Sequence, residues 1–332
     1  MTRLLLVVIV LLALAAALAW HLWTRSETPG PLIVETTVII QAGTDMQSIA
    51  ADLVKAGVVE RATEFILLAR IEKADRRLSA GEFAFPARVS MRQALDILMR
   101  GRTVAHAVTI PEGLTSADIL TRLASEQVLV GEMGDHPSEG SLLPETYHVS
   151  RGETRMALIE RMRADMDAVV RDLWAGRDPD LPFKTTQEAV ILASIVEKET
   201  STPSEYARIS GVFVNRLEHG MRLQSDPTVI YALTDGHMPL GRALHSADLK
   251  IDSPFNTYRV AGLPPAPICH PGRETLRAVL HPARHDELYF VADGSGGHRF
   301  SKTLAAHKRN VANWRKVRAA QRLIPRRKPE GE

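Results

Sequence analysis

Cysteine, net charge and metal-binding patterns are scarce in this sequence, and each scarcity excludes a class of protein. The 332 residues contain one cysteine, Cys269, so no disulfide can form within the chain and a disulfide-stapled secreted scaffold is excluded. Lysine and arginine number 41 against 39 aspartates and glutamates, and the net charge of +2 gives no reason to expect a nucleic-acid partner. Hydrophobic residues make up 45%, which is typical of a globular protein with a core.

Several catalytic and cofactor-binding motifs are also missing. The sequence has no P-loop and no dinucleotide fingerprint, and we expect no cofactor. Five histidines crowd the last quarter of the chain: His270, His281, His285, His298 and His307. None of them forms H-E-x-x-H or pairs with cysteines at zinc spacing, so we expect no metal site. The stretch "DGSGGH" lacks the G-x-S-x-G pattern and is better interpreted as a hairpin turn.

The N-terminus carries a long apolar run, "LLLVVIVLLALAAALAW", over residues 4–20. Its length is close to what a helix needs to span a bilayer, and we predict a single transmembrane anchor over residues 1–23. The alternative is a cleaved signal peptide, because Ala17-Leu18-Ala19 resembles a cleavage site. Either interpretation exports the rest of the chain. Residues 24–35, which include two prolines, are predicted to be a linker.

A strand–turn–helix pattern occurs twice, at an offset of 70 residues. Five positions match: Ile40 with Ile110, Gly43 with Gly113, Ile49 with Ile119, Leu53 with Leu123, and Val58 with Val128. Between the copies the sequence predicts a helix over 61–72, a strand at "AGEFAFP", and a helix capped by Ser90. The order strand, helix, helix, strand predicts a small LysM-like α/β subdomain over residues 36–104.

Residues 105–325 are predicted to form a larger, mixed α+β domain, followed by a basic tail over 326–332. Helices are expected from about Thr154 to Trp174 and from near Gln187, the latter capped by Thr186. Pro203 suits the first turn of a further helix, which Gly220 would end. A helix over 274–281, a hairpin at "ELYFVADGSGGHRFSK" and a basic helix from Leu304 complete the expected α+β fold.

The stretch "ASIVEKETST" ends an apolar helix with two carboxylates, Glu197 and Glu199. Residues two apart on a helix point about 200° away from each other, so these two cannot share a face. They are either solvated helix-end residues or, in one case, a group with chemistry. A carboxyl near a helix C-terminus has a raised pKa, and beside apolar walls it could act as a general acid.

Two further stretches gather hydrogen-bonding side chains. In "RLQSDPTVIYAL" these are Gln224, Asp226, Thr228 and Tyr231, and Asp226 could instead be a simple helix N-cap. In "FNTYRVAGLPPAP" they are Asn256, Thr257 and Tyr258, in what could also be an ordinary loop. Amide and aromatic groups in a proline-stiffened loop suit a sugar, which needs directional hydrogen bonds and a flat apolar surface.

Several long motifs together resemble one family. The stretches "LPETYHV", "ASIVEKET", "GVFVNRLEHGMRLQSDPTVIYAL", "SPFNTYRVAGLPPAPICHPG" and "LYFVADGSGGHRFSKTLAAHKRNV" occur in this order. They resemble the YceG-like family of endolytic murein transglycosylases, and the resemblance runs over nearly the whole chain. It implies a lyase that cuts the β-1,4 link from N-acetylmuramic acid to N-acetylglucosamine in peptidoglycan and leaves a 1,6-anhydro end.

The resemblance also implies roles for particular residues. Glu199 would be the catalytic group, acting first as acid and then as base, and Glu197 would support substrate binding. The remaining implied substrate-binding residues are Gln224, Asp226, Thr228, Tyr231, Asn256 and Tyr258. The implied location is the cytoplasmic (inner) membrane, single-pass, with the catalytic domain on the periplasmic side. The implied partners are glycan strands and the lipid bilayer, with cell-wall synthases as further candidates.

Two alternatives remain open at this stage. One is a non-catalytic, peptidoglycan-binding scaffold that tethers the wall to the membrane, which the LysM-like half supports equally well. The other is an anchored hydrolase that uses water with the same glutamate. The E-K-E-T helix favours an enzyme over a scaffold, because a binding protein needs no shielded acid.

Overall fold

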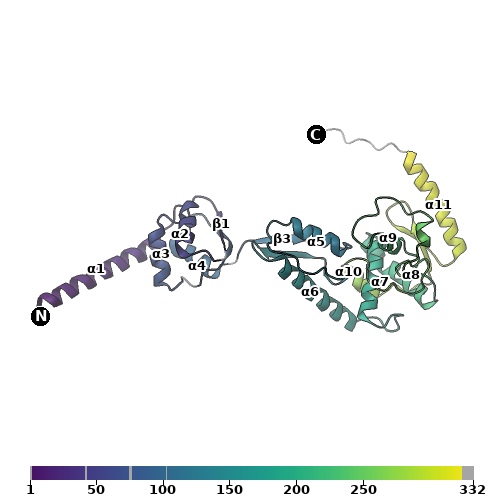
Figure 1. The fold of residues 1–332 in the computed structure, drawn as a ribbon, viewed down its shortest axis with the longest axis horizontal. Coiled ribbons are helices and arrows are strands. Elements are labelled where there is room, and N and C mark those ends of the chain that lie inside the picture. Colours follow the sequence, from purple (N-terminus) through teal and green to yellow (C-terminus); the bar gives the residue numbers. More distant parts are fainter. Residues whose placement is uncertain (1, 42, 75–76, 102, 324–332) are drawn as a thin grey trace. The chain divides into compact units, whose positions relative to one another are not determined.

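A computed structural model describes residues 2–41, 43–74, 77–101 and 103–323. The chain divides into two compact units, shown in Figure 1. Unit 1 comprises residues 1–107, 128–130 and 148–153, and unit 2 comprises residues 108–127, 131–147 and 154–332. The predicted boundary between residues 104 and 105 stays a prediction, and the predicted basic tail over 326–332 lies outside the described residues.

Unit 1 contains one antiparallel strand pair with helices packed around a common core. Its elements are α1 (Thr2–Glu27), β1 (Thr36–Ile40), α2 (Met46–Lys55), α3 (Ala62–Ile71), β2 (Gly81–Phe85) and α4 (Met91–Arg100). β1 and β2 pair with Val38 opposite Phe83. Ser90 caps α4 as predicted, in a capping box with Gln93. The predicted order strand, helix, helix, strand is present, whereas the likeness to a LysM module stays a prediction.

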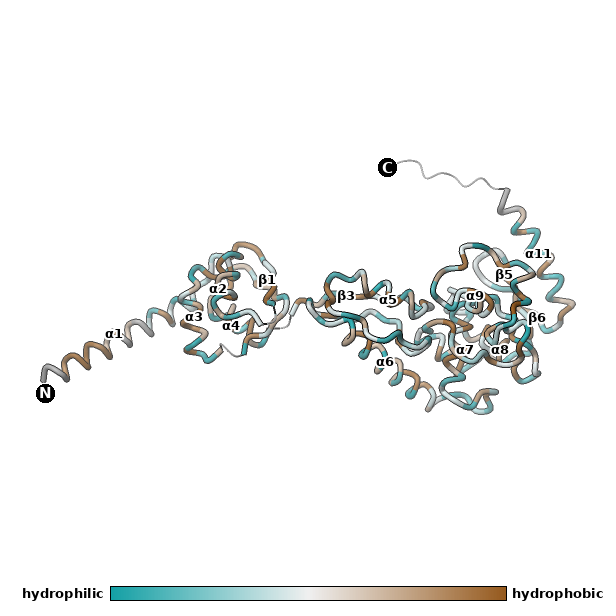
Figure 2. Tube along the Cα trace, in the orientation of Figure 1, coloured by the Kyte–Doolittle hydropathy of each residue, from teal (hydrophilic) through white to brown (hydrophobic). Residues whose placement is uncertain are grey.

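α1 is longer than the predicted anchor. It continues to Glu27, because the first helix-breaking residues are Pro29 and Gly30, so residues 24–27 of the predicted linker are helical. Hydrophobic residues occupy much of its first half (Figure 2). Within the described part of the chain, however, no helix satisfies the length and apolarity required to cross a membrane, so the predicted transmembrane helix over 1–23 is not found there.

Unit 2 is built mainly from helices. Its helical elements are, in chain order, α5 (Ser116–Ser125), α6 (Arg155–Ala175), α7 (Thr186–Glu199), the 3-10 turn η1 (Pro203–Glu205), α8 (Tyr206–Glu218), α9 (Asp226–Thr234), the 3-10 turn η2 (Asp248–Lys250), α10 (Arg273–Leu280) and α11 (Leu304–Leu323). The hairpin pairs β5 (Tyr289–Ala292) with β6 (His298–Ser301), as predicted. β3 (Ala105–Thr109) pairs with β4 (Thr146–Ser150), and three residues of each of these strands belong to unit 1. The mixed α+β class is confirmed.

α7 is the central helix of unit 2. Its residues from Ala189 to Val196 are all buried, and it packs against α6, α8, α9 and α10. Thr185, not Thr186, is its N-cap, because Thr185 has Glu188 three residues later to complete the capping box. Because the middle of α7 is buried on all sides, the helix can hold the side chain of its last residue, Glu199, in a fixed position.

The predicted repeat is confirmed in its local structure. Gly43 and Gly113 both adopt positive φ angles, 81° and 75°, between a strand and a helix. Ile49 and Leu53 of α2 are buried, and so are their counterparts Ile119 and Leu123 of α5. Positive φ is readily adopted by glycine, which explains its presence at both turns.

Candidate active site

The two glutamates at the end of α7 have different environments, as helical geometry requires. Glu197 Oε2 accepts hydrogen bonds from Gly272 N at 3.0 Å and from Thr275 Oγ1 at 2.6 Å. Gly272 is the N-cap of α10, so Glu197 binds the positive end of that helix. Glu197 does not line the cavity that holds Glu199, and its predicted part in substrate binding stays a prediction.

Glu199 is the last residue of α7 and borders a cavity of about 580 Å³. Ser225 Oγ donates a hydrogen bond of 2.5 Å to Glu199 Oε1. The other walls of the cavity come from α8, the segment before α9, the 255–258 loop, the β5–β6 hairpin and α11. A cavity of this volume is in the range that holds a small ligand.

The environment of Glu199 favours the protonated acid. Burial raises the pKa of Glu199 to about 7, and the negative charge of Asp226 adds to the rise. The hydrogen bond from Ser225 and the charges of His298 and Arg216 act in the opposite direction. A carboxyl with this pKa is populated in both protonation states near neutral pH, which suits a group that gives and then takes a proton.

Replacing Ser225 by alanine tests this balance. The hydroxyl donates to the charged carboxylate, so its loss should raise the pKa of Glu199 above its present value of about 7. If Glu199 must be protonated to act, activity falls as the pH rises past its pKa. In Ser225→Ala this fall should occur at a higher pH than in the wild type. A pH–rate profile measures the effect, and a fall at unchanged or lower pH would contradict it.

Three of the predicted substrate-binding residues line the same cavity. They are Gln224, Asp226 and Tyr258. Tyr258 Oη donates to Asp226 Oδ1 at 2.6 Å, which ties the 255–258 loop to the start of α9. Asp226 is the first residue of α9, and Ser225 precedes it as N-cap, so the alternative interpretation of Asp226 as the cap is wrong. Ser225 makes no side-chain capping hydrogen bond, and its hydroxyl binds Glu199 instead.

Three other predicted residues lie outside the cavity and support it. Thr228 is fully buried, and its hydroxyl bonds to Ser225 O and Thr257 Oγ1. Asn256 is also fully buried and donates to two carbonyls of the preceding loop. Tyr231 packs against Phe255, with ring centroids 4.9 Å apart. The structure therefore gives these three a role in shaping the loop and α9.

Four further residues contribute to the site but are not among the site residues predicted from the sequence: Arg216, Ser225, Tyr289 and His298. Arg216 is 6% exposed, and its guanidinium donates to Leu288 O at 2.7 Å and Leu223 O at 2.6 Å. It also lies 5.3 Å from the ring centroid of Tyr289. Ser225 could have been inferred from its place before Asp-Pro, but neither the buried arginine nor the histidine follows a local pattern.

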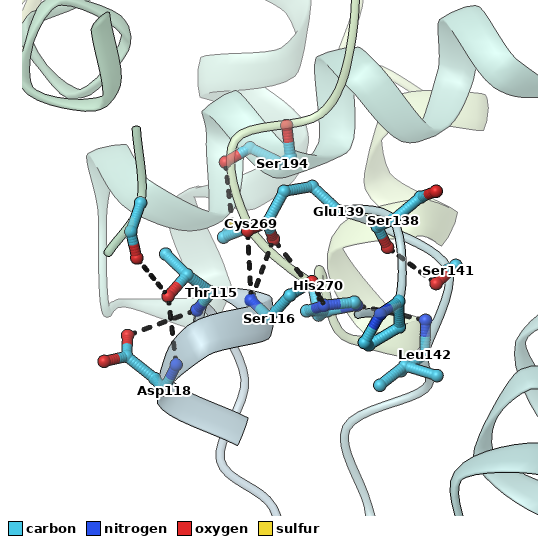
Figure 3. A network of polar contacts seen from close by, with 12 residues as sticks. Thr115, Ser116, Asp118, Ser138, Glu139, Ser141, Leu142, Ser194, Cys269 and His270 are labelled. Carbon is cyan, nitrogen blue, oxygen red and sulfur yellow. Dashed lines mark hydrogen bonds and ion pairs between the residues drawn. The ribbon is translucent and has the colours of Figure 1, made fainter. Parts of the chain in front are cut away.

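A second polar network in unit 2 is independent of this cavity (Figure 3). His270 is fully buried; its Nδ1 accepts from Leu142 N at 3.0 Å and its Nε2 lies 2.9 Å from Ser116 Oγ. Since Nδ1 accepts, the proton is on Nε2 and is donated to the serine, so His270 cannot act as a base for Ser116. Glu139 accepts from Ser116 N, and burial raises its pKa to about 7. The network joins the start of α5 to two loops and does not make a nucleophilic serine.

The predicted absence of a metal site stays a prediction. Over the ranges that the structure describes, no three histidine, cysteine, aspartate or glutamate side chains are grouped so that they could hold a metal ion. Cys269 is buried, and its Sγ contacts Ser194 O at 3.3 Å.

Comparison with known proteins gives a consistent result. The sequence profile of the YceG-like family matches residues 38–313. A protein named endolytic murein transglycosylase from Streptococcus pneumoniae serotype 2 (strain D39 / NCTC 7466) is 30% identical over 321 residues, covering 83% of this chain and 58% of that protein. One of the same name from Bacillus subtilis (strain 168) is 28% identical over 313 residues, covering 83% and 84%.

A solved structure is also similar. It is a 2.6 Å crystal structure of a putative YceG-like protein from Listeria monocytogenes, with a TM-score of 0.53 and 29% identity. The match covers 83% of this chain and 98% of that one. The chain spans less than two thirds of the length of the streptococcal relative, with 58% covered.

Proposed function

Since this chain belongs to the YceG-like family, we propose that it cleaves peptidoglycan glycan strands as a lytic transglycosylase with Glu199 as its acid and base. The observation that carries the proposal is the position of Glu199. It ends a buried helix and borders a cavity of about 580 Å³, and burial raises its pKa to about 7. The relatives named endolytic murein transglycosylase support the substrate class.

The proposed reaction uses one carboxyl group twice. Protonated Glu199 gives its proton to the glycosidic oxygen, and the bond from that oxygen to C1 of the muramic sugar breaks. The 6-hydroxyl oxygen of the same sugar then bonds to C1, and its proton goes to the Glu199 carboxylate. The product has a 1,6-anhydro end, no water is consumed, and Glu199 is protonated again. Paired carboxylates at fixed separation, which most glycosidases need, are not required.

The neighbours of Glu199 suit this use. Asp226, the other carboxylate lining the cavity, accepts a hydrogen bond from Tyr258 and so presents a fixed acceptor. Gln224 holds a positive φ of 52°, an unusual conformation for a residue other than glycine, next to the cavity. We assign Gln224, Asp226 and Tyr258 to binding the sugar hydroxyls and amide. Arg216 lies at the same cavity and balances the negative charge that Glu199 acquires.

Product analysis tests the proposal. Purified glycan strands are digested with the protein and the ends are identified by mass. Anhydro ends are the expected result. Reducing ends would indicate a hydrolase that uses water, and the absence of cleavage with retained binding would indicate the scaffold. Either of these two results overturns the proposed reaction.

We also propose that α1 places the protein at the cytoplasmic membrane, with unit 2 on the outer side, where the glycan strands are. Support comes from consecutive apolar side chains from Leu5 to Leu12, which are 45% to 64% exposed. Deleting residues 2–23 should move the protein from the membrane fraction to the supernatant, as fractionation and immunoblotting would show. Recovery of the full chain in a salt-washed supernatant would contradict this. A cell-wall synthase as partner stays a prediction.

A further inference from the structure

His298, the first residue of β6, lines the same cavity as Glu199. Its side chain is 13% exposed, and its ring lies edge-on to Phe290, with centroids 5.4 Å apart. The charge of a protonated His298 acts on Glu199 and lowers its pKa, so the two groups are electrostatic neighbours. The one-carboxyl reaction does not use this histidine.

Glu205 fixes the orientation and tautomer of His298. Its Oε1 accepts from the backbone N of His298 at 2.8 Å, and its Oε2 accepts from Nδ1 at 2.7 Å. A carboxylate only accepts, so Nδ1 carries a proton, and in the neutral ring the lone pair is on Nε2. No described residue donates to that Nε2 in a hydrogen bond. The carboxylate therefore fixes the ring so that Nε2 is the nitrogen left to accept a proton.

The same carboxylate is connected to the end of α7. Thr200, the residue after Glu199, is 7% exposed, and its Oγ1 donates to Glu205 Oε2 at 3.3 Å. Glu205 lies on η1, which directly follows α7. The chain Thr200–Glu205–His298 therefore couples the position of the imidazole to the position of Glu199.

Glu199 has a reason to need a second proton carrier. Its Oε1 accepts from Ser225 at 2.5 Å, so Oε2 is the oxygen that is freer to exchange protons. That oxygen would first face the leaving glycosidic oxygen and then the 6-hydroxyl. With a basic nitrogen at the same cavity, Glu199 Oε2 does not have to reach both the leaving glycosidic oxygen and the 6-hydroxyl.

We propose that His298 carries the proton of the 6-hydroxyl to Glu199, an inference that rests on the proposed function. His298 Nε2 takes this proton as O6 bonds to C1, after Glu199 has given its own proton to the leaving oxygen. The imidazolium then passes the proton to the Glu199 carboxylate, and both groups return to their starting states. His298 is in this reaction a catalytic residue, and Glu205 is a positioning residue.

The other histidine at the cavity does not have these properties. His307 stacks on Tyr289, with centroids 5.2 Å apart, and its buried Nδ1 has no hydrogen-bond partner among the described residues. No carboxylate orients it. A matched control exists outside the cavity: His281 Nδ1 lies 2.7 Å from Asp178 Oδ1, the same type of pair at the same distance.

His298→Ala should lower kcat on strand cleavage by about 100-fold, the range typical of lost general acid–base catalysis. Added imidazole should restore part of the lost kcat, because a free base can occupy the vacated space. His281→Ala should change neither the rate nor the response to imidazole. A purely structural role for His298 would give a loss that imidazole does not repair, and that result overturns the inference.

Two further variants keep the test decisive. His298→Asn keeps a donor for Glu205 but has no basic nitrogen, so it should lose activity while keeping the wild-type melting temperature and glycan binding. Glu205→Gln should lose less, and the Glu205→Gln/His298→Ala double variant should be no worse than His298→Ala, since both act through one group. An active His298→Asn overturns the inference alone, whereas cleavage by Glu199→Gln would overturn the proposed function itself.

Discussion

Replacing Glu199 by glutamine is expected to abolish glycan cleavage, with a loss on the order of 10³-fold or more. Glutamine has nearly the same shape and can still accept the hydrogen bond that Ser225 donates to Glu199 at 2.5 Å. It cannot give a proton to the leaving oxygen, and removal of a general acid typically costs 10²- to 10⁴-fold. The release of anhydro ends from glycan strands, followed by mass, measures the loss.

Glu197→Gln is the matched control for this experiment. It makes the same chemical change two residues earlier on the same helix, and Glu197 contacts Gly272 N and Thr275 Oγ1, not the cavity. We expect Glu197→Gln to retain clearly more activity than Glu199→Gln. Equal loss in the two variants would show that the cavity does not distinguish the two carboxyl groups and would contradict the assignment of Glu199.

Replacing Arg216 by methionine is expected to destabilise unit 2 by about 3 to 5 kcal/mol. The buried guanidinium donates to Leu223 O at 2.6 Å and Leu288 O at 2.7 Å, two carbonyls from segments far apart in the sequence. A charged hydrogen bond contributes about 1.5 to 3 kcal/mol, and its loss also leaves a buried carbonyl without a partner. Methionine fills similar apolar space without donating. Urea unfolding, followed by circular dichroism, measures the change.

Arg163→Met is the comparison for this variant. Arg163 pairs with Glu160 at 2.7 Å on the surface of α6, and both side chains are well exposed. Exposed ion pairs contribute about 0 to 1 kcal/mol, so the midpoint of unfolding should scarcely move. A change of less than about 1 kcal/mol in Arg216→Met would show that the 222–224 and 288–289 segments do not depend on the buried guanidinium.

Several local features were predictable because they depend on neighbours in the sequence. The predicted cap Ser90 precedes α4, and the helix predicted from about Thr154 begins at Arg155, with Thr154 as its N-cap. The different directions of Glu197 and Glu199 follow from helical geometry alone. Even the error at Thr186 is small, since its neighbour Thr185 has the correct spacing to Glu188.

The membership of the site was only partly predictable. Of the polar residues expected to bind substrate, Gln224, Asp226 and Tyr258 line the cavity, whereas Thr228, Tyr231 and Asn256 stabilise the elements beside it. All six lie on stretches rich in hydrogen-bonding groups, and such a stretch does not reveal which side chains point inward. That direction depends on where the loop and α9 pack.

The sequence by itself determined the order of helices and strands, the paired turns at Gly43 and Gly113, and the presence of a carboxyl at the end of a buried helix. These are properties of φ and ψ preferences, helical periodicity and capping, which act over a few residues. Only the tertiary structure brought Arg216, Ser225 and His298 to the cavity of Glu199, because they come from α8, the N-cap of α9 and the β5–β6 hairpin, respectively. Contacts between such distant positions depend on how whole elements pack, and no local pattern specifies that packing.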